Sequence, residues 1–183
     1  LLVLLRTDLI SSWRKATPPD APNRFVINIM PDQADAFQQK LKDANITKYD
    51  WYPMIRGRLV AVNEVAVGPD SYADERAKRL MDRDFNLSHS SMLPPHNDVV
   101  AGKWVNDEEG GASVEEGLAK TLNLKLGDRL RFDMGGVPVD SRVTSLRKVD
   151  WGSMRANFFV MFPVATLPQA SATYMTAFRA PGS

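Results

Sequence analysis

An alternating stretch followed at once by a helical repeat is the strongest constraint on how this chain folds. From residue 24 to residue 30, apolar side chains recur at every second position, which is typical of a strand. Residues 34–44 then carry apolar side chains at steps of three and four, which predicts a helix with one buried stripe. Asp32 is expected to cap that helix, and extended stretches are predicted at 49–55 and 59–67. Strand, helix and strand in this order predict a compact βαβ-type unit.

The remainder of the chain adds more strands than helices. A short helix is predicted after Ser71 and Asp74, which resemble a capping box. The clearest helix pattern is Ser113–Leu122, with Ser113 and Glu116 as a reciprocal cap. Further extended segments are predicted at 84–90, 99–101 (as a buried strand), 129–134, 137–149, 158–162 and 173–178. We therefore expect an α+β fold with a mixed sheet.

Charge and cysteine content exclude several classes of function. The 183 residues include 23 basic and 22 acidic side chains, and the net charge is +1. Proteins that bind nucleic acid usually concentrate positive charge to displace counterions from phosphates, so we expect no nucleic-acid partner. The chain has no cysteine, which excludes disulfides, thiolate metal sites and cysteine nucleophiles within it.

The first residues have an unusual order of apolar and charged side chains. Leu1–Leu5 is entirely apolar, and basic residues and Trp13 follow it. A secretory signal has its charge first, whereas the exit end of a transmembrane helix has cations and tryptophan after the apolar stretch. An amphipathic helix packed on the domain explains the same segment equally well. The proline-rich residues 16–23 cannot continue a helix and are expected to form a linker.

Residues suited to catalysis are few and poorly spaced. His89 and His96 are seven positions apart, and no third zinc ligand is evident, so we interpret both as ordinary loop histidines. No Gly-x-Ser-x-Gly elbow or phosphate-binding glycine loop occurs. The acidic residues at 82–84 and 107–109 are typical of surface ion pairs and solvated turns. We therefore predict no catalytic residues, no metal site and no cofactor.

One aromatic segment could serve binding. Trp51, Tyr52 and Met54 lie together in the sequence, and such side chains can line an apolar groove for a lipid-like ligand or a partner. The alternative is that they are ordinary core anchors, which is the usual role of tryptophan in a domain of this size.

Seven short stretches, in fixed order, carry a family resemblance. They are residues 53–59, 84–88, 99–104, 113–119, 124–130, 143–151 and 157–159. Their order and spacing resemble the extracytoplasmic domain of the large MacB/FtsX-type ABC-transporter permeases, in the ten-span YbbP-like branch. The likeness extends from residue 24 to residue 178.

The resemblance implies a two-lobe periplasmic domain between two transmembrane helices. Residues 1–23 would be the end of a transmembrane helix and a linker. Residues 24–65 plus 155–183 would form a MacB-like porter lobe of βαβ type, and residues 66–154 an inserted second lobe. The localisation implied is the inner (plasma) membrane, with this segment facing the periplasm.

The resemblance also implies a role and partners. A cytoplasmic ABC ATPase subunit would drive the permease, and this domain would transmit the movement to export or extract a lipid-like cargo. A periplasmic partner such as a lysophospholipase is expected from the YbbP-like branch. The family has no catalytic motif in this domain, so it implies no catalytic residues.

Two other classes of function remain open from the sequence. A free-standing soluble module that binds lipids or peptides would also suit an apolar groove. A hydrolase that uses carboxylates is a further alternative.

Overall fold

The computed structural model describes residues 22–151, 156–164 and 172–180. The strands are β1 (Arg24–Ile29), β2 (Tyr49–Val62), β3 (Val65–Ala66), β4 (Phe85–His89), β5 (Asn97–Gly102), β6 (Gly111–Glu115), β7 (Arg129–Met134), β8 (Val137–Val149), β9 (Val160–Phe162) and β10 (Thr173–Phe178). The α-helices are α2 (Ala34–Asp43), α3 (Glu75–Met81) and α4 (Glu116–Leu122), and single 3-10 turns occupy Pro31–Gln33 and Pro69–Ser71. The described chain is thus α+β, with strands more abundant than helices.

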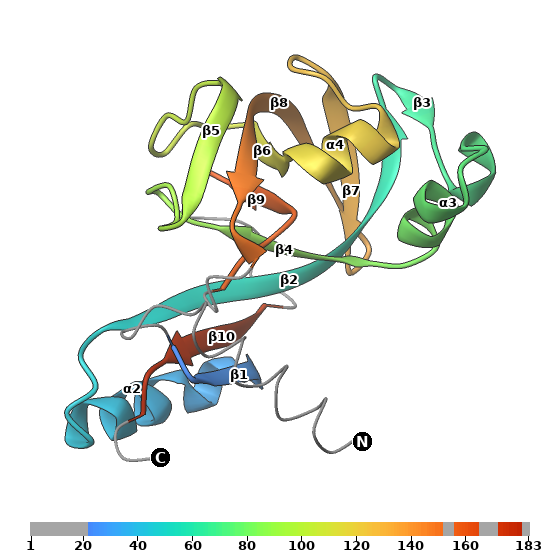
Figure 1. Cartoon of the computed structure of the whole chain (residues 1–183). Helices are drawn as coiled ribbons and strands as arrows, with labels where there is room; N and C mark the ends of the chain where they lie inside the picture. The colour runs from blue at the N-terminus through green and yellow to red at the C-terminus, as the bar shows by residue number, and fades with distance from the viewer. Residues whose placement is uncertain (1–21, 152–155, 165–171, 181–183) are drawn as a thin grey trace, which may run out of the picture.

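Strand β2 belongs to two parts of the sheet at once (Figure 1). Its first half, residues 49–54, pairs with β10. Its second half pairs with β4 and β7. One strand of 14 residues therefore runs from the end of the molecule that carries β1, β10 and α2 into the larger part that carries α3 and α4.

The larger part is a closed ring of strands. The pairs run from β2 to β4, β9, β6, β8 and β7, and β7 pairs with β2 again. Closure leaves these six strands without a free edge, as in a small barrel. Strand β5 is added outside the ring, on β8.

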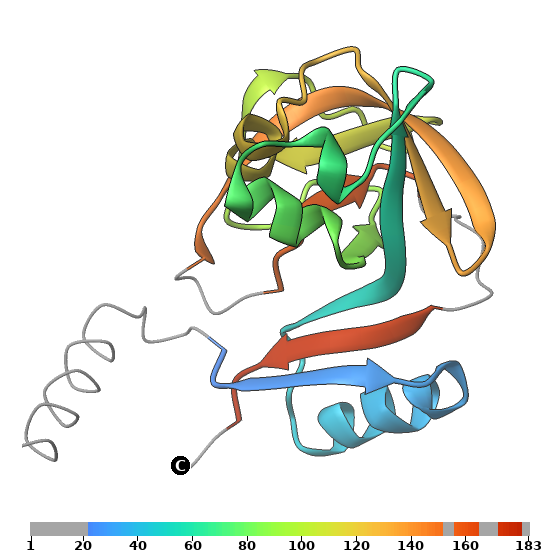
Figure 2. The same cartoon turned by 90° about the vertical axis from the view of Figure 1, so that its right-hand side faces the viewer.

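The smaller part contains the strand–helix–strand order predicted from the sequence, with a third strand inserted. Strand β1 is antiparallel to β10, which is in turn antiparallel to β2, so β1 and β2 run parallel on either side of β10 (Figure 2). Helix α2 packs on one face of this sheet, where the ring of Phe37 lies 6.2 Å from that of Trp51. Periodicity in residues 24–67 cannot reveal β10, because that strand comes from the far end of the chain.

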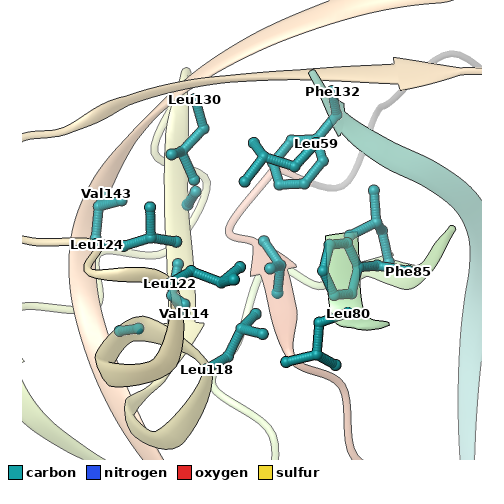
Figure 3. Close-up of a cluster of buried hydrophobic side chains, with 14 of the residues drawn as sticks. Leu59, Leu80, Phe85, Val114, Leu118, Leu122, Leu124, Leu130, Phe132 and Val143 are labelled. Atoms are coloured by element: carbon teal, nitrogen blue, oxygen red, sulfur yellow. The ribbon is translucent and has the colours of Figure 1, made fainter. Parts of the chain in front are cut away.

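The main hydrophobic core lies between the strands of the ring and helices α3 and α4 (Figure 3). Leu80 of α3 and Leu118 and Leu122 of α4 pack with strand residues on this face. The strand residues labelled in the close-up are Leu59, Phe85, Val114, Leu130, Phe132 and Val143, with Leu124 from the turn after α4. The two short helices are therefore stabilised mainly by tertiary packing, since seven residues are too few for an isolated helix.

The helix predicted at Ser113–Leu122 begins three residues later than expected, at Glu116. Residues 111–115 form β6, which is buried along its whole length. A strand covered on both faces shows no alternation, so its last three residues, 113–115, were wrongly assigned to the helix that follows. Glu115, rather than Ser113, caps α4, because its carboxylate accepts hydrogen bonds from the amides of Gly117 and Leu118 at 2.9 and 2.7 Å.

Three smaller expectations also fail for identifiable reasons. Asp32 lies inside a 3-10 turn and does not cap α2. The strand predicted to be buried at 99–101 is β5, and because β5 lies outside the ring, Val100 is exposed. In β1, an irregularity at Asn28 (φ 60°) breaks the alternation, and Phe25 is 54% exposed.

No helix in the described part of the chain is long and apolar enough to cross a membrane. The predicted membrane-helix end and linker, residues 1–23, lie outside the described residues except for the last two.

Candidate functional site

The two ends of the described chain meet at one end of the molecule. The amide of Asn23 donates to the carbonyl of Phe178 at 3.0 Å. The side chain of Asn23 then bonds the backbone of Ala180 twice, accepting from its amide at 2.7 Å and donating to its carbonyl at 3.2 Å. One asparagine therefore holds together two segments 157 residues apart. The chain enters and leaves this fold at the same place.

An open crevice of about 960 Å³ lies beside this junction. Pro22 and Arg179 line it from the two ends, and Pro95 lines it from the loop before β5. The rest of its wall is Ala177 of β10 and the segment from the end of α2 to the start of β2, residues 44–50. The crevice thus lies between the smaller part of the molecule and a loop of the larger part.

A fully buried arginine links four segments of the larger part. The guanidinium of Arg147, on β8, donates from Nε to the hydroxyl of Ser113 on β6 at 2.8 Å and from Nη1 to the side-chain oxygen of Asn97 on β5. Its Nη2 donates to the carbonyls of Phe158, Phe159 and Ser113 at 2.9, 3.2 and 3.2 Å. Arg147 therefore ties β8 to β6, to β5 and to the segment that leads into β9.

The charge of Arg147 is partly compensated. Burial lowers the pKa of Arg147 to about 10, and the carboxylate of Glu115, its neighbour in register on β6, opposes that shift. The guanidinium consequently remains charged at neutral pH. Because Glu115 also caps α4, the same carboxylate serves the helix and the buried cation.

The predicted groove residues do not share one face. Successive residues of a strand point to opposite sides, so Trp51 points away from Tyr52 and Met54. The ring of Trp51 stacks on Tyr174 at 5.4 Å on the side of α2. Met54 is buried in a second apolar cluster with Phe158, against which Tyr52 also packs. The structure therefore brings Tyr52 and Met54 together but separates Trp51 from them.

Comparison with known proteins identifies a relative. The ABC transporter permease YbbP of Escherichia coli K12 is 38% identical over 179 residues, which is 98% of this chain and 21% of the permease. The chain is homologous to a segment of an ABC-transporter permease. It spans about a fifth of the length of that relative. The resemblance stated from the sequence motifs is confirmed, and no family model matches the chain.

A solved structure is also similar to the permease segment. It is the crystal structure of a domain assigned to a permease of Porphyromonas gingivalis, with 11% sequence identity and a TM-score of 0.45. The match covers 79% of this chain and 61% of that one.

The sequence analysis did not identify Arg147 as a buried residue that links several segments, although the sequence contained a signal for it. Three of the stretches that resemble the permease family, residues 113–119, 143–151 and 157–159, converge on this side chain. A charged residue at a position that the strand pattern predicts to be buried, between Ser145 and Val149, could have indicated a buried cation.

The two histidines of the permease segment have different environments. His96 is exposed on a turn with φ 61°. His89 was interpreted from the sequence as a loop residue, but it ends β4 and is buried. Its Nε2 has no hydrogen-bond partner among the described residues, and burial lowers the pKa of His89 from its ordinary value of 6.5. Those residues contain no group of three or more side chains that could hold a metal ion.

Folding stability should decrease in mild acid because of His89. Below about pH 6.5 the unfolded chain takes up a proton at this position more readily than the folded chain does. The free energy of unfolding therefore decreases as the pH decreases. In urea unfolding at about pH 7 and about pH 5, His89→Gln should lose less stability than the unmodified chain. His96→Asn is the matched control, since asparagine tolerates the left-handed backbone. An equal acid sensitivity in all three proteins would contradict this assignment.

Proposed function

We propose that this chain is the extracytoplasmic domain of an ABC-transporter permease, inserted between two membrane-spanning segments. The observation that carries the proposal is the junction of Asn23 with Ala180, which puts both ends of the described chain at one point. An insertion between consecutive transmembrane helices needs both ends of the domain to face the same membrane, and this junction meets that condition. The homology to one fifth of a permease supports the same interpretation.

The proposed role is to transmit movement from the membrane to the larger part of the domain. A cytoplasmic ATPase would move the membrane helices, and these would move the junction at Asn23 and Ala180. Strand β2 offers a direct path, because its 14 residues are paired to β10 at one end and to the closed ring at the other. A strand paired along both halves resists bending more than a loop does.

We extend this proposal to the architecture and to the location of the domain. The smaller part, with β1, α2, β10 and the first half of β2, corresponds in this proposal to a porter-like lobe close to the membrane. The ring of strands corresponds in this proposal to the second lobe, facing the periplasm. The ring contains strands from the predicted insertion, residues 66–154, and also residues 55–62 of β2 and 160–162 of β9, which the resemblance assigned to the porter lobe. The lipid-like cargo and the lysophospholipase partner stay predictions that rest on the family resemblance.

The location can be tested with single cysteines, because the chain contains none. Met92→Cys and Val65→Cys would be introduced into the full-length permease, from whose other segments any cysteines have been removed. Both side chains are exposed, at 68% and 65%. Spheroplasts treated with a membrane-impermeant maleimide should be labelled at both positions without lysis.

Leu87→Cys is the matched control for this experiment. Leu87 is fully buried on β4, so a cysteine there should react only after denaturation. Labelling of Met92→Cys and Val65→Cys only after lysis would show that the domain faces the cytoplasm. That outcome would overturn the proposal.

A further inference from the structure

A hollow of about 380 Å³ lies over the end of β2 and the adjoining strands β7 and β8. Three arginines line it, Arg129, Arg131 and Arg142, together with the carboxylates of Glu64 and Asp140. Arg129 and Arg131 lie on β7 on either side of Leu130, which is buried, so they lie on the outer face of the sheet. Arg142 lies on β8 and pairs in register with Arg129, so it is on the same face. Ala61 of β2 also lines the hollow, and its small side chain leaves space there.

Two of the three arginines already have carboxylate partners. Arg131 lies directly opposite Asp140 in the β7–β8 pair, and its Nε and Nη2 donate to the two carboxylate oxygens at 2.7 and 3.2 Å. Arg129 donates from Nη1 to Glu64, in the β2–β3 turn, at 2.7 Å. These pairs hold two guanidinium groups in place at the rim of the hollow.

Arg142 is different. It lies directly opposite Arg129, so two side chains of like charge face each other across the strands. Like charges in this position are destabilising. Within the described part of the chain, the side chain of Arg142 makes no hydrogen bond and no ion pair. Three arginines against two carboxylates leave one uncompensated positive charge in the hollow.

We propose that this hollow binds an anionic group, a phosphate or a carboxylate, between Arg142 and Arg129. The guanidinium fork is suited to such groups because it can donate two parallel hydrogen bonds. An anion there would neutralise the unpaired charge and relieve the repulsion between the two arginines. The volume lies within the range of small-molecule sites, so the group can belong to a small ligand.

Ser141 also lines the hollow, but it lies between Asp140 and Arg142 on β8 and pairs in register with Leu130. Its side chain therefore points to the inner face of the sheet, away from the guanidinium groups. The proposed site consequently rests on the arginines. The inference does not depend on the function proposed above.

Isothermal titration of the 183-residue chain with inorganic phosphate tests the site directly. Arg142→Gln should weaken binding by at least about tenfold, because it removes the unpaired donor group. Arg58→Gln is the control, since Arg58 is an exposed strand arginine like Arg142 but is paired with Asp84 and does not line the hollow. The control should change affinity by less than about twofold. Thermal unfolding of both variants verifies that they are folded.

A second arm distinguishes the two sources of phosphate. Co-sedimentation with phosphatidylglycerol vesicles and with phosphatidylcholine vesicles reports a lipid headgroup, whereas binding of inorganic phosphate alone reports a free anion. Loss of binding in Arg142→Gln in either arm supports the site. Equal affinities for Arg142→Gln and Arg58→Gln in both arms, or no binding of either probe to the unmodified chain, would overturn it.

Discussion

Arg147→Ala is expected to lower the free energy of unfolding by about 3–5 kcal/mol. The substitution removes the guanidinium that donates to the carbonyls of Phe158 and Ser113 and to the side chains of Ser113 and Asn97 in a buried place, and it also leaves a cavity. It further removes the cation that faces the carboxylate of Glu115. The shift in the midpoint of urea unfolding, at constant m value, measures the loss.

Two companion variants define what Arg147 contributes. Lys148→Ala, at the next position of β8, is exposed and should change stability by no more than about 0.5 kcal/mol. Arg147→Met fills most of the space but donates no hydrogen bonds. Its free energy of unfolding should therefore decrease nearly as much as that of Arg147→Ala. If Arg147→Met were as stable as the unmodified chain, packing rather than hydrogen bonding would be the role of this side chain.

Gly102→Ala should lower the free energy of unfolding by about 2–4 kcal/mol. Gly102 ends β5 with φ +71°, a left-handed conformation that costs other residues energy. A Cβ added there would lie 2.2 Å from the carbonyl oxygen of Thr144 on β8. Because that atom belongs to the backbone, the two strands themselves would have to separate. Thermal or urea unfolding of the variant measures the cost.

Gly127→Ala separates the two causes of this effect. Gly127 has φ +88°, but a Cβ there would meet nothing within 4 Å. Gly127→Ala should therefore lower the free energy of unfolding only by the cost of the left-handed backbone conformation, about 1–2 kcal/mol. A loss in Gly102→Ala no greater than that in Gly127→Ala would show that β5 and β8 can move apart without cost.

Local patterns predicted the elements whose contacts are local. The β7–β8 hairpin was predicted at 129–134 and 137–149, and it forms there, because a glycine turn and alternating strands specify it together. The helix at Ala34–Asp43 also follows from its apolar stripe. In contrast, β6 was mistaken for the start of a helix, because a fully buried strand has no polar face to reveal its period.

The candidate sites depended on position in space rather than on sequence. Trp51, Tyr52 and Met54 are neighbours in the chain, yet strand geometry sends Trp51 to the face opposite the other two. Arg129 and Arg142 lie on successive strands and face each other across the hairpin. The register of the strands therefore decided which side chains could act together.

The sequence by itself determined the α+β class, most of the strands and helices, and the relationship to a transporter permease, because periodicity and ordered motifs are properties of the chain. Only the tertiary structure decided that β10 separates β1 from β2, that six strands close into a ring, that Arg147 is buried at the meeting of four segments, and that residues 23 and 180 are joined. These features arise from contacts between residues far apart in the chain, and such contacts leave no local period to be read.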